Sequence, residues 1–582
     1  MPRIATNVNK QRNFKDYVIY QIYTRSFKDS NGDGIGDIPG IIQKLDYLET
    51  LGVDVLWLSP FCSSPNRDNG YDVSDYRNVM KEFGTLKDLD RLIEKAHERG
   101  MLIMMDLVMN HSSIEHPWFK DKPEYYYWTD SPNNWDSYFS DSAWTWDPDR
   151  RQYYLHLFYP QQPDLNWENP EVRREFHDIA EFWIQRGIDA FRLDAIHHIG
   201  KPEGLPDAPE PKNELEHRNF KNTRRTHEYL REFREKALQN GAVFTVGETG
   251  GTTPRTSRHY VDKKRKELDM IFLFDHLWKL KNDIRNLPEV FRPIYRHLRK
   301  DGWNTNFLSN HDFPRHLSIV GNDALYHRES ATTFAALLMS LWGTPFIYQG
   351  EEIGMTNVSF SKLRDYDCEA AKNRYYRALK DGRSEDQAFD EFRRSTRDNA
   401  RTPFQWNSAK NAGFTTGIPW MKVNPNYSQI NASSQKGRAG SIFEHYRFLI
   451  HLRKNWTVLS RGDLKFLPSG KDRVLAWKRS VARKEKREFG LSVGPDALIL
   501  ISNPADHSAL WKRPAGVGRN YRLIYSNSNS QLLLDQDAAG RPVSGEREVD
   551  SVAVTGAGEF AGEQLGSTVI LGPWETRLYV RG

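Results

Sequence analysis

Acidic side chains stand at the ends of four short apolar segments of this sequence. Asp106, Asp194 and Glu248 each close or follow such a segment, and Asp312 follows a fourth. One strand-end carboxylate can cap the next helix, but four like charges at one edge repel each other unless the protein uses them. Glycoside cleavage requires two carboxyl groups beside one bond, one as acid and base and one as nucleophile or base. The pattern therefore predicts glycosidic bond cleavage.

A basic residue accompanies the second of these acids. Arg192 precedes Asp194 by two residues, so strand alternation points both side chains to the same face. A guanidinium beside Asp194 is expected to lower the pKa of that carboxyl and keep it ionised, as a nucleophile requires. Glu248 must instead begin the cycle protonated, and a drier pocket is expected to raise its pKa.

Two histidines lie next to strand-end acids. His111 comes five residues after Asp106, and His311 directly precedes Asp312. A lone histidine is more often a structural hydrogen-bonding residue, but beside a carboxylate it is well suited to bind a hydroxyl group. Both histidines are therefore predicted to hold sugar hydroxyls.

A short acidic loop follows the first predicted strand. The segment DSNGDGIGD (29–37) has the spacing of an EF-hand loop, but Gly40 stands where the bidentate glutamate belongs, so an EF-hand is rejected. Oxygen ligands at alternate residues still suit a structural Ca²⁺, and a tight Asp/Gly turn without metal is the alternative. The predicted ligand set is Asp29, Asn31, Asp33, Ile35 and Asp37.

Eight apolar segments alternate with amphipathic helical patterns over the first 350 residues. Continuous apolar runs are typical of strands buried on both faces. Eight of them predict an α/β fold, a (β/α)₈ TIM barrel whose C-terminal strand ends would gather the carboxylates. A doubly wound open sheet is the alternative. The expected strands are 17–23, 53–59, 101–108, 188–194, 242–248, 269–275, 303–309 and 344–350.

Two long gaps and a change of pattern divide the chain. We expect the barrel in 1–110 and 179–457, with 111–178 as an inserted domain B after strand 3. A second insertion is expected at 355–440, after strand 8. From residue 458 the pattern becomes short and β-like, which predicts an all-β C-terminal domain over 458–582, an antiparallel β-sandwich.

Composition limits the classes of function. The chain has 582 residues, 82 Lys and Arg against 77 Asp and Glu, and 38% hydrophobic residues. This near-neutral balance argues against a nucleic-acid partner, and we find neither a signal-type apolar region nor a span-length apolar run. With only Cys62 and Cys368, a reducing compartment is favoured. We expect a cytoplasmic monomer or weak homodimer that binds a small oligosaccharide and no membrane.

The sequence resembles glycoside hydrolase family 13, the α-amylase superfamily, over nearly its whole length. The four signature regions, in the family's order, are similar to MMDLVMNH (104–111), FRLD (191–194), GE (247–248) and SNHD (309–312). Three further segments resemble the oligo-1,6-glucosidase and α-glucosidase group: QPDLNWENP (162–170), QGEEIGMTN (349–357) and RDNARTPFQW (397–406).

This resemblance implies a retaining mechanism. Asp194 would be the nucleophile, Glu248 the general acid and base, and Asp312 the stabiliser of the transition state. Asp72 and Arg397 are similar to the pair that closes the non-reducing end of the glucose pocket, which implies removal of one terminal glucose at a time. Members of the family also commonly bind Ca²⁺ at the acidic loop. The implied platform under the glucose is Tyr71, and the implied pocket-wall residues are Phe158 and Gln162.

Linkage preference is predicted from the residue after the nucleophile. In this group it tends to be Val in α-1,6-specific and Thr in α-1,4-specific enzymes, whereas here it is Ala195. The small side chain opens space beside the leaving group. We therefore expect a broad α-glucosidase for maltose-type oligosaccharides, with isomaltose and sucrose as further substrates.

Three alternatives remain. A sucrose isomerase or glucosyltransferase would place an aromatic clamp at Gly250 and an Arg-rich loop near 277–283, and neither is recognisable. A non-catalytic transporter heavy chain shares the barrel but carries a membrane span and loses catalytic acids. A trehalose-6-phosphate hydrolase needs a cationic cluster for its phosphate. Its candidates are Lys201, Arg224, Arg225 and Arg255.

Overall fold

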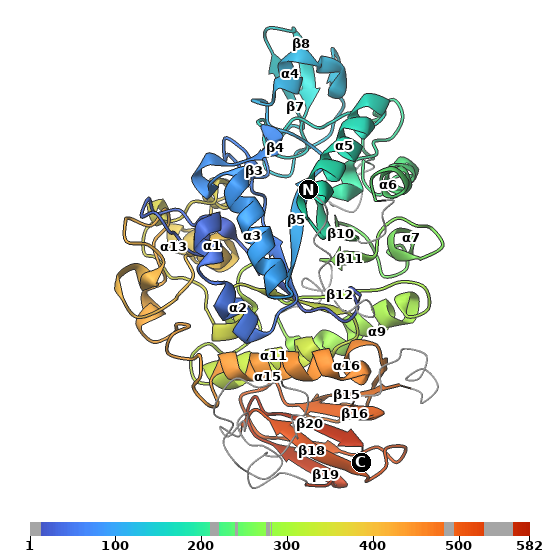
Figure 1. Ribbon diagram of the computed structural model, residues 1–582, viewed down its shortest axis with the longest axis vertical. Helices are drawn as coiled ribbons and strands as arrows, with labels where there is room; N and C mark the ends of the chain where they lie inside the picture. The colour runs from blue at the N-terminus through green and yellow to red at the C-terminus, as the bar shows by residue number, and fades with distance from the viewer. Residues whose placement is uncertain are drawn as a thin grey trace.

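Eight parallel strands form the central sheet of the computed structural model, which describes residues 13–209, 220–238, 243–274, 280, 282–481, 494–528 and 563–581 (Figure 1). Their order is β11-β10-β9-β5-β2-β1-β13-β12. The two end strands meet where Thr305 Oγ1 donates to the Ile271 carbonyl at 2.9 Å. The predicted TIM barrel is confirmed. Its strands are β1 (Ile19–Ile22), β2 (Val55–Leu58), β5 (Leu102–Val108), β9 (Ala190–Asp194), β10 (Phe244–Thr249), β11 (Met270–Leu273), β12 (Thr305–Asn306) and β13 (Thr344–Tyr348).

Helices cover the outside of the barrel. In α3 (Leu86–Glu98), Thr85 and Asp88 form a capping box, and apolar residues at helical spacing are buried against the sheet. In α5 (Pro170–Arg186), Asn169 caps the N-terminus and left-handed Gly187 ends the helix. The other covering helices are α1 (Ile38–Ile42), α2 (Leu45–Leu51), α6 (Arg224–Ala237), α7 (Arg258–Val261), α9 (Leu287–Leu298), α11 (His327–Ser340), α15 (Ile442–Asn455) and α16 (Thr457–Ser460). The short helix α10 (His316–Ile319) instead lines the cavity at the strand ends.

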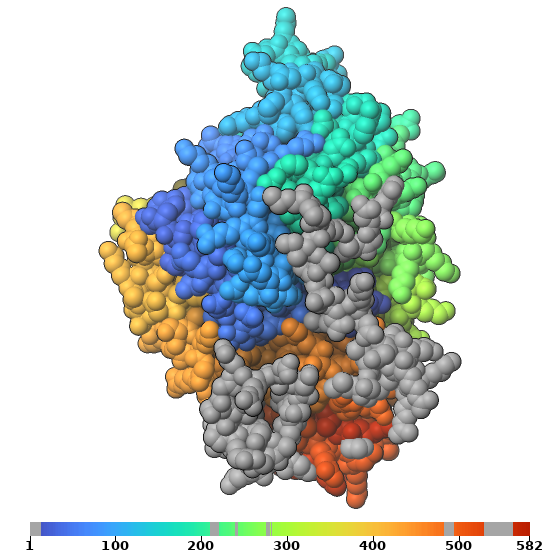
Figure 2. Space-filling view, in the orientation of Figure 1, coloured from blue at the N-terminus to red at the C-terminus, as the bar shows by residue number. Residues whose placement is uncertain are grey.

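The segment after β5 leaves the barrel and protrudes at one end of the molecule (Figures 1 and 2). It carries α4 (Pro117–Asp121) and a three-stranded antiparallel sheet of β6 (Trp128–Thr129), β8 (Gln152–Leu155) and β7 (Trp144–Asp147). A buried ion pair of 2.6 Å between Lys201 and Asp164 ties this segment to the loop after β9. Lys201 Nζ also donates to Asn110 Oδ1 at 3.0 Å.

A helical pair follows β13. The helices α12 (Glu369–Lys380) and α13 (Glu385–Ser395) pack on each other around a small apolar cluster of their own. Phe139 of the protruding segment packs against the same cluster. The pair leads into α14 (Asp398–Arg401). Two chain excursions thus meet above the strand ends.

The C-terminal part consists of antiparallel strands at the opposite end of the molecule (Figure 1). A five-stranded sheet and a two-stranded sheet share one apolar core around Trp511 and Tyr579, as expected for a sandwich. Asn527 joins this part to α11 through hydrogen bonds to Thr332 and Thr333. The strands are β14 (Asp463–Phe466), β15 (Leu475–Ser480), β16 (Ala497–Ser502), β20 (Thr576–Arg581) and β18 (Tyr521–Ser526), and β17 (Ala509–Lys512) with β19 (Thr568–Leu571). Among the helices that the structure describes, none has the length and apolar character to cross a membrane.

Candidate active site

Three adjacent barrel strands carry the predicted acids close together, with Asp106 one level below Asp194 and Glu248. Asp106 on β5 is in register with Arg192 on β9, and Val246 on β10 is in register with the same arginine. Glu248 lies two residues beyond Val246 and Asp194 two residues beyond Arg192, so both acids project from the same height of the barrel. The alternation expected for Arg192 and Asp194 is what the structure contains.

Arg192 binds all three carboxylates with one buried guanidinium. Its Nη1 lies 2.7 Å from Asp106 Oδ1 and 2.5 Å from Asp194 Oδ1. Its Nη2 binds the carboxylate of Glu248. The two predicted catalytic acids therefore occupy neighbouring nitrogens of one planar group, and their side chains face each other across it.

This cluster carries more negative than positive charge. Burial raises the pKa of Asp194 well above its usual range, and Glu248 and Asp106 add to that effect against the opposing Arg192. Burial likewise raises the pKa of Asp106 to about 6. The expectation that Arg192 keeps the pKa of Asp194 low is wrong in its net direction, because one cation cannot offset burial and two further carboxylates. The cluster is therefore built to hold a proton.

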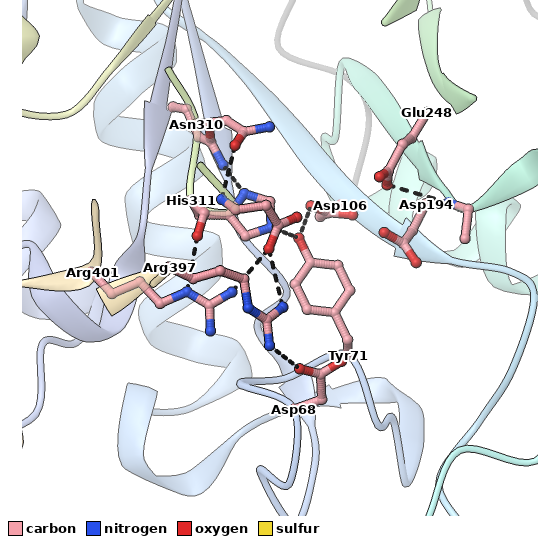
Figure 3. A network of polar contacts seen from close by, with 12 residues as sticks. Asp68, Tyr71, Asp106, Asp194, Glu248, Asn310, His311, Arg397 and Arg401 are labelled. Atoms are coloured by element: carbon pink, nitrogen blue, oxygen red, sulfur yellow. Dashed lines mark hydrogen bonds and ion pairs between the residues drawn. The ribbon is translucent and has the colours of Figure 1, made fainter. Parts of the chain in front are cut away.

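Next to this cluster lies a chain of hydrogen bonds through Tyr71 and His311. Gln21 Nε2 donates to His311 Nδ1 at 2.8 Å, which leaves the ring proton on Nε2. His311 Nε2 lies 2.7 Å from the Tyr71 hydroxyl, and that hydroxyl donates to Asp106 Oδ2 at 3.1 Å (Figure 3). Burial lowers the pKa of His311 to about 3, so the ring is neutral and serves as a fixed donor.

Asp312 occupies the opposite electrostatic environment. Arg397 Nη1 lies 3.2 Å and Arg401 Nη2 3.0 Å from its Oδ1. Burial opposes ionisation of this carboxyl, but His311 and the two arginines outweigh burial and hold its pKa below the usual range. Asp312 is therefore ionised, and it lines the same cavity as Asp194 and Glu248.

The partner of Arg397 differs from the one predicted. Arg397 Nη2 lies 3.5 Å from Asp68 Oδ1 (Figure 3). Asp68 also accepts a hydrogen bond of 3.2 Å from Gln162 Nε2. Asp72 has no exposed surface. Its carboxylate accepts hydrogen bonds from Ser64 Oγ, Arg67 N and Asp68 N.

The prediction for Asp72 is therefore wrong, and Asp68 takes its place. Asn69 and Gly70 both have positive φ, 53° and 95°, so the chain turns sharply between the two acids. That turn sends Asp68 into the cavity and folds Asp72 behind it as the acceptor of loop N–H groups. The Asp-Asn-Gly sequence is typical of such a turn, but it does not by itself indicate which of the two acids faces the cavity.

The remaining predicted wall residues come together. Gln162 Nε2 lies 3.1 Å from His111 Nε2, and the rings of His111 and Phe158 are 4.9 Å apart. Phe139, which the sequence reasoning missed, lies under the Arg397 guanidinium at 5.3 Å. The cavity measures about 1370 Å³. Ala195, His197, His198 and Gly250 line another part of its wall.

The acidic loop after β1 binds its own backbone. Asp29 accepts N–H groups from Asn31, Gly32 and Gly34 at 2.8–2.9 Å, and Asp37 caps α1 through Gly40. Over the described residues, no three acidic, histidine or cysteine side chains gather as a metal-holding group. The loop has the geometry of an Asp/Gly turn. The side-chain atoms that it could offer to a metal ion are all oxygens.

Residues 21–462 match the model of the α-amylase catalytic domain. The chain belongs to the α-amylase family. It is 43% identical over 543 residues to an oligo-1,6-glucosidase of Parageobacillus thermoglucosidasius, covering 88% of this chain and 94% of the relative. It is 43% identical over 526 residues to a glucan 1,6-alpha-glucosidase of Streptococcus pneumoniae, covering 85% and 96%.

Solved structures of related enzymes share the whole architecture. The trehalulose synthase of Pseudomonas mesoacidophila superposes with a TM-score of 0.86 at 36% identity, covering 98% of this chain and 99% of that chain. At this identity and coverage, the barrel and its excursions belong to one family of glycoside-processing enzymes, and the chain is a glycoside hydrolase by family.

The correction at the Arg397 pair gives a direct test. Asp68→Asn should lower kcat/KM for p-nitrophenyl α-glucoside about ten- to hundredfold, because a charged partner of Arg397 is lost. Asp72→Asn should leave kcat/KM within about twofold and lower the melting temperature instead, because three loop donors lose a charged acceptor. Steady-state kinetics and thermal unfolding measure both. A large loss of kcat/KM in Asp72→Asn, with little loss in Asp68→Asn, would instead place Asp72 in the pocket.

Proposed function

We propose that this protein is a retaining, exo-acting α-glucosidase that releases α-glucose from the non-reducing end of short α-glucosides. The observation that carries the proposal is the pair of carboxylates, Asp194 and Glu248, on neighbouring nitrogens of Arg192. A retaining glycosidase needs two carboxyl groups this close to one anomeric carbon, one of them protonated.

In the first step Asp194 is the nucleophile. Its carboxylate oxygen forms a bond to the anomeric carbon as the glycosidic C–O bond breaks, and Glu248 gives its proton to the departing oxygen. Three carboxylates share the single cation Arg192, so one proton among them reduces the excess negative charge of the cluster. In the reacting state Glu248 carries this proton, and Asp194, bonded to Arg192 Nη1, reacts as the carboxylate. The product of this step is a glucosyl ester on Asp194 and a free leaving group.

In the second step Glu248 acts as a base. It takes a proton from water as the water oxygen bonds to the anomeric carbon, and the ester bond to Asp194 breaks. Two inversions leave the α-configuration unchanged. Asp312, ionised between its arginines, accepts hydrogen bonds from the sugar hydroxyls, and these bonds strengthen as positive charge develops on the ring.

Exo action follows from the closed end of the pocket. Asp68, in the loop after β2, and Arg397, directly before α14, bridge one end of the pocket, and Phe139 of the protruding segment lies against Arg397. A polymer chain cannot continue past this bridge, so the terminal glucose fits and an internal one does not. Short oligosaccharides are therefore the substrates.

The linkage is proposed to include α-1,6 as well as α-1,4 bonds. Two relatives at 43% identity are named for α-1,6 substrates. Ala195 adds little bulk beside the nucleophile and lines the cavity, which leaves room for maltose-type leaving groups.

Isomerisation of sucrose is the second candidate, favoured by the structural neighbours named as trehalulose synthases. Gly250 has no side chain to clamp a released fructose, and most of 277–283 lies outside the described residues. Hydrolysis of trehalose 6-phosphate is disfavoured. Lys201 is buried in its ion pair with Asp164, and the cavity lining contains none of Lys201, Arg224, Arg225 and Arg255.

We further propose a cytoplasmic monomer or weak homodimer. Cys62 and Cys368 are both buried and free, which suits a reducing compartment.

A substrate panel tests the proposal. Maltose, isomaltose, sucrose, trehalose, trehalose 6-phosphate and soluble starch are incubated with the enzyme, and products are resolved by chromatography and by NMR of the first-formed anomer. We expect α-glucose from the short α-glucosides and no internal cleavage of starch. β-Glucose as the first product, or starch fragments, would reject the proposal, and trehalulose or isomaltulose from sucrose would favour the isomerase.

Ala195 gives a second test, on specificity. Ala195 has a left-handed backbone with φ 46°, and a β-branched side chain there narrows the space for the leaving group. Ala195→Val should shift kcat/KM toward isomaltose over maltose, with some loss of thermal stability from the strained backbone. Ala195→Thr is the control, because Thr has nearly the same shape as Val and places the same strain on the left-handed backbone. An unchanged maltose-to-isomaltose ratio in Ala195→Val would remove the explanation.

The acidic loop is proposed to hold a structural Ca²⁺. Its donors would be the Asp29, Asn31, Asp33 and Asp37 side chains and the Ile35 carbonyl, an oxygen-only set of the kind Ca²⁺ prefers. The ion would stabilise the loop and take no part in the reaction.

Removal of the ion should lower stability. After dialysis against EDTA, added Ca²⁺ is expected to raise the melting temperature by about 3 °C or more, since binding to the native state alone stabilises it. The response should vanish in Asp33→Ala. A melting temperature unaffected by EDTA, Ca²⁺ and Mg²⁺ would leave the turn without a metal.

A further inference from the structure

Three nitrogens of the Arg397 guanidinium contact three different residues. Nη1 lies 3.2 Å from Asp312 Oδ1, and Nη2 lies 3.5 Å from Asp68 Oδ1. The third nitrogen, Nε, donates a hydrogen bond of 3.5 Å to the sulfur of Cys368. The two carboxylates line the cavity, whereas Cys368 belongs to the apolar cluster of the helical pair. Arg397 therefore connects the glucose pocket to the helices α12 and α13.

Cys368 is held in place by its own main chain. It is the N-cap residue of α12, and only 4% of its surface is exposed. Its N–H donates to Asp398 Oδ2 at 3.0 Å, and its carbonyl accepts the N–H groups of Ala371 and Lys372 at 3.1 Å. Because its sulfur makes no capping bond to the helix, it remains available as the acceptor for Arg397.

Asp398 joins the same two segments a second time. Its Oδ2 accepts the N–H groups of Asp367 and Cys368, at 2.9 and 3.0 Å, and the hydroxyl of Thr396 at 3.1 Å. Arg397 and Asp398 are neighbours in the chain, so one contacts Cys368 through its sulfur and the other through its backbone. The start of α12 and the start of α14 thus form one hydrogen-bonded unit, which fixes the sulfur relative to the Arg397 backbone.

A sulfur atom suits this position chemically. The cation of Arg397 already faces two carboxylates, and a third carboxylate at Nε would compete with them for the same charge. A cysteine sulfur is only a weak acceptor, so it can orient Nε without drawing the guanidinium away from Asp68 and Asp312. Because the guanidinium is planar, a fixed Nε also fixes the directions in which Nη1 and Nη2 point.

We propose that Cys368 is a positioning residue for the glucose pocket: its sulfur holds Arg397 Nε so that the other two nitrogens stay directed at Asp68 and Asp312. The proposal rests on the α-glucosidase function given above. In that function the bridge between Asp68 and Arg397 closes the pocket beyond the terminal glucose, and Asp312 binds the hydroxyls of that glucose. Loss of the sulfur should therefore weaken binding of the terminal glucose, whatever leaving group follows it.

Matched cysteine variants test the proposal. Cys368→Ala removes the acceptor, and Cys368→Ser supplies a hydroxyl acceptor in its place. Cys62 is the other cysteine of the chain. It is also buried, but its sulfur donates to the Tyr76 carbonyl at 3.6 Å and it does not line the cavity. Cys62→Ala and Cys62→Ser therefore control for the same changes of volume and chemistry.

The measurements are steady-state kinetics with maltose, isomaltose and p-nitrophenyl α-glucoside, and calorimetric titration with 1-deoxynojirimycin. The three substrates share the terminal glucose and differ in their leaving groups. The inhibitor has the shape of that glucose and carries no leaving group. Together they separate binding of the terminal glucose from binding of the leaving group.

We expect Cys368→Ala to raise KM for all three substrates about three- to tenfold, and the Kd of the inhibitor by a similar factor, while kcat stays within about twofold. A purely structural defect would instead lower kcat through the fraction of active enzyme and leave the Kd unchanged. Cys368→Ser should recover most of the loss, and both Cys62 variants should match the wild-type enzyme in KM and Kd.

Arg397→Lys tests whether Cys368 acts through Arg397. Lysine has no nitrogen at the position of Nε, so the sulfur has no donor to hold. In the Arg397→Lys background, Cys368→Ala should therefore change the Kd of the inhibitor by less than about twofold, whereas two independent sites would give the full effect.

An unchanged KM and Kd in a folded Cys368→Ala protein would overturn the proposal, as would an equal change in Cys62→Ala or an undiminished effect in the Arg397→Lys background. If melting temperatures show that Cys368→Ala is unfolded, Cys368→Val replaces it, because valine also lacks an acceptor and keeps apolar contacts in the cluster. A wild-type enzyme that cleaves none of the three glucosides would instead reject the α-glucosidase function itself.

Discussion

The buried Arg192 guanidinium is the constraint on which the site depends. It binds Asp106, Asp194 and Glu248, which come from three neighbouring strands. Without it, three carboxylates this close together in a buried site would repel each other. With Arg192 present, the excess negative charge of the three carboxylates favours retention of one proton. General acid catalysis of bond cleavage requires such a proton. The parallel register of β5, β9 and β10 makes this arrangement possible, since it fixes the heights of all four side chains.

The site therefore contains two electrostatic environments side by side. Around Asp194, the single cation Arg192 binds three carboxylates. Asp312, in contrast, is bound by two arginines, Arg397 and Arg401. Burial raises the pKa of both carboxyls, but the neighbouring charges differ. Glu248 and Asp106 add to burial at Asp194, so its pKa moves up, whereas His311, Arg397 and Arg401 outweigh burial at Asp312, so its pKa moves down. Asp312 is thus kept ionised for binding, whereas the cluster around Asp194 can carry a proton. Different surroundings give carboxyl groups of one site different roles.

The barrel and the main acids were predictable because they follow from local pattern. Apolar runs mark buried strands, and their ends mark the edge where Asp106, Asp194 and Glu248 meet. The choice between Asp68 and Asp72 was not predictable from the sequence, because it depends on two positive-φ residues that reverse the chain between them. The net pKa direction of Asp194 depends on the number of acids around Arg192, and the hydrogen bond between Arg397 and Cys368 joins residues on either side of the helical pair. Such properties arise only from the tertiary arrangement.

The central claim is that Asp194 forms the covalent bond to glucose. The direct measurement is to treat the enzyme with 5-fluoro-α-glucosyl fluoride, quench it in acid, digest it and locate the added mass by tandem mass spectrometry. The account predicts a fluoroglucosyl group on Asp194, with slow return of activity as the ester hydrolyses. A label on Glu248 or on any other residue, or inactivation without a covalent adduct, would contradict it.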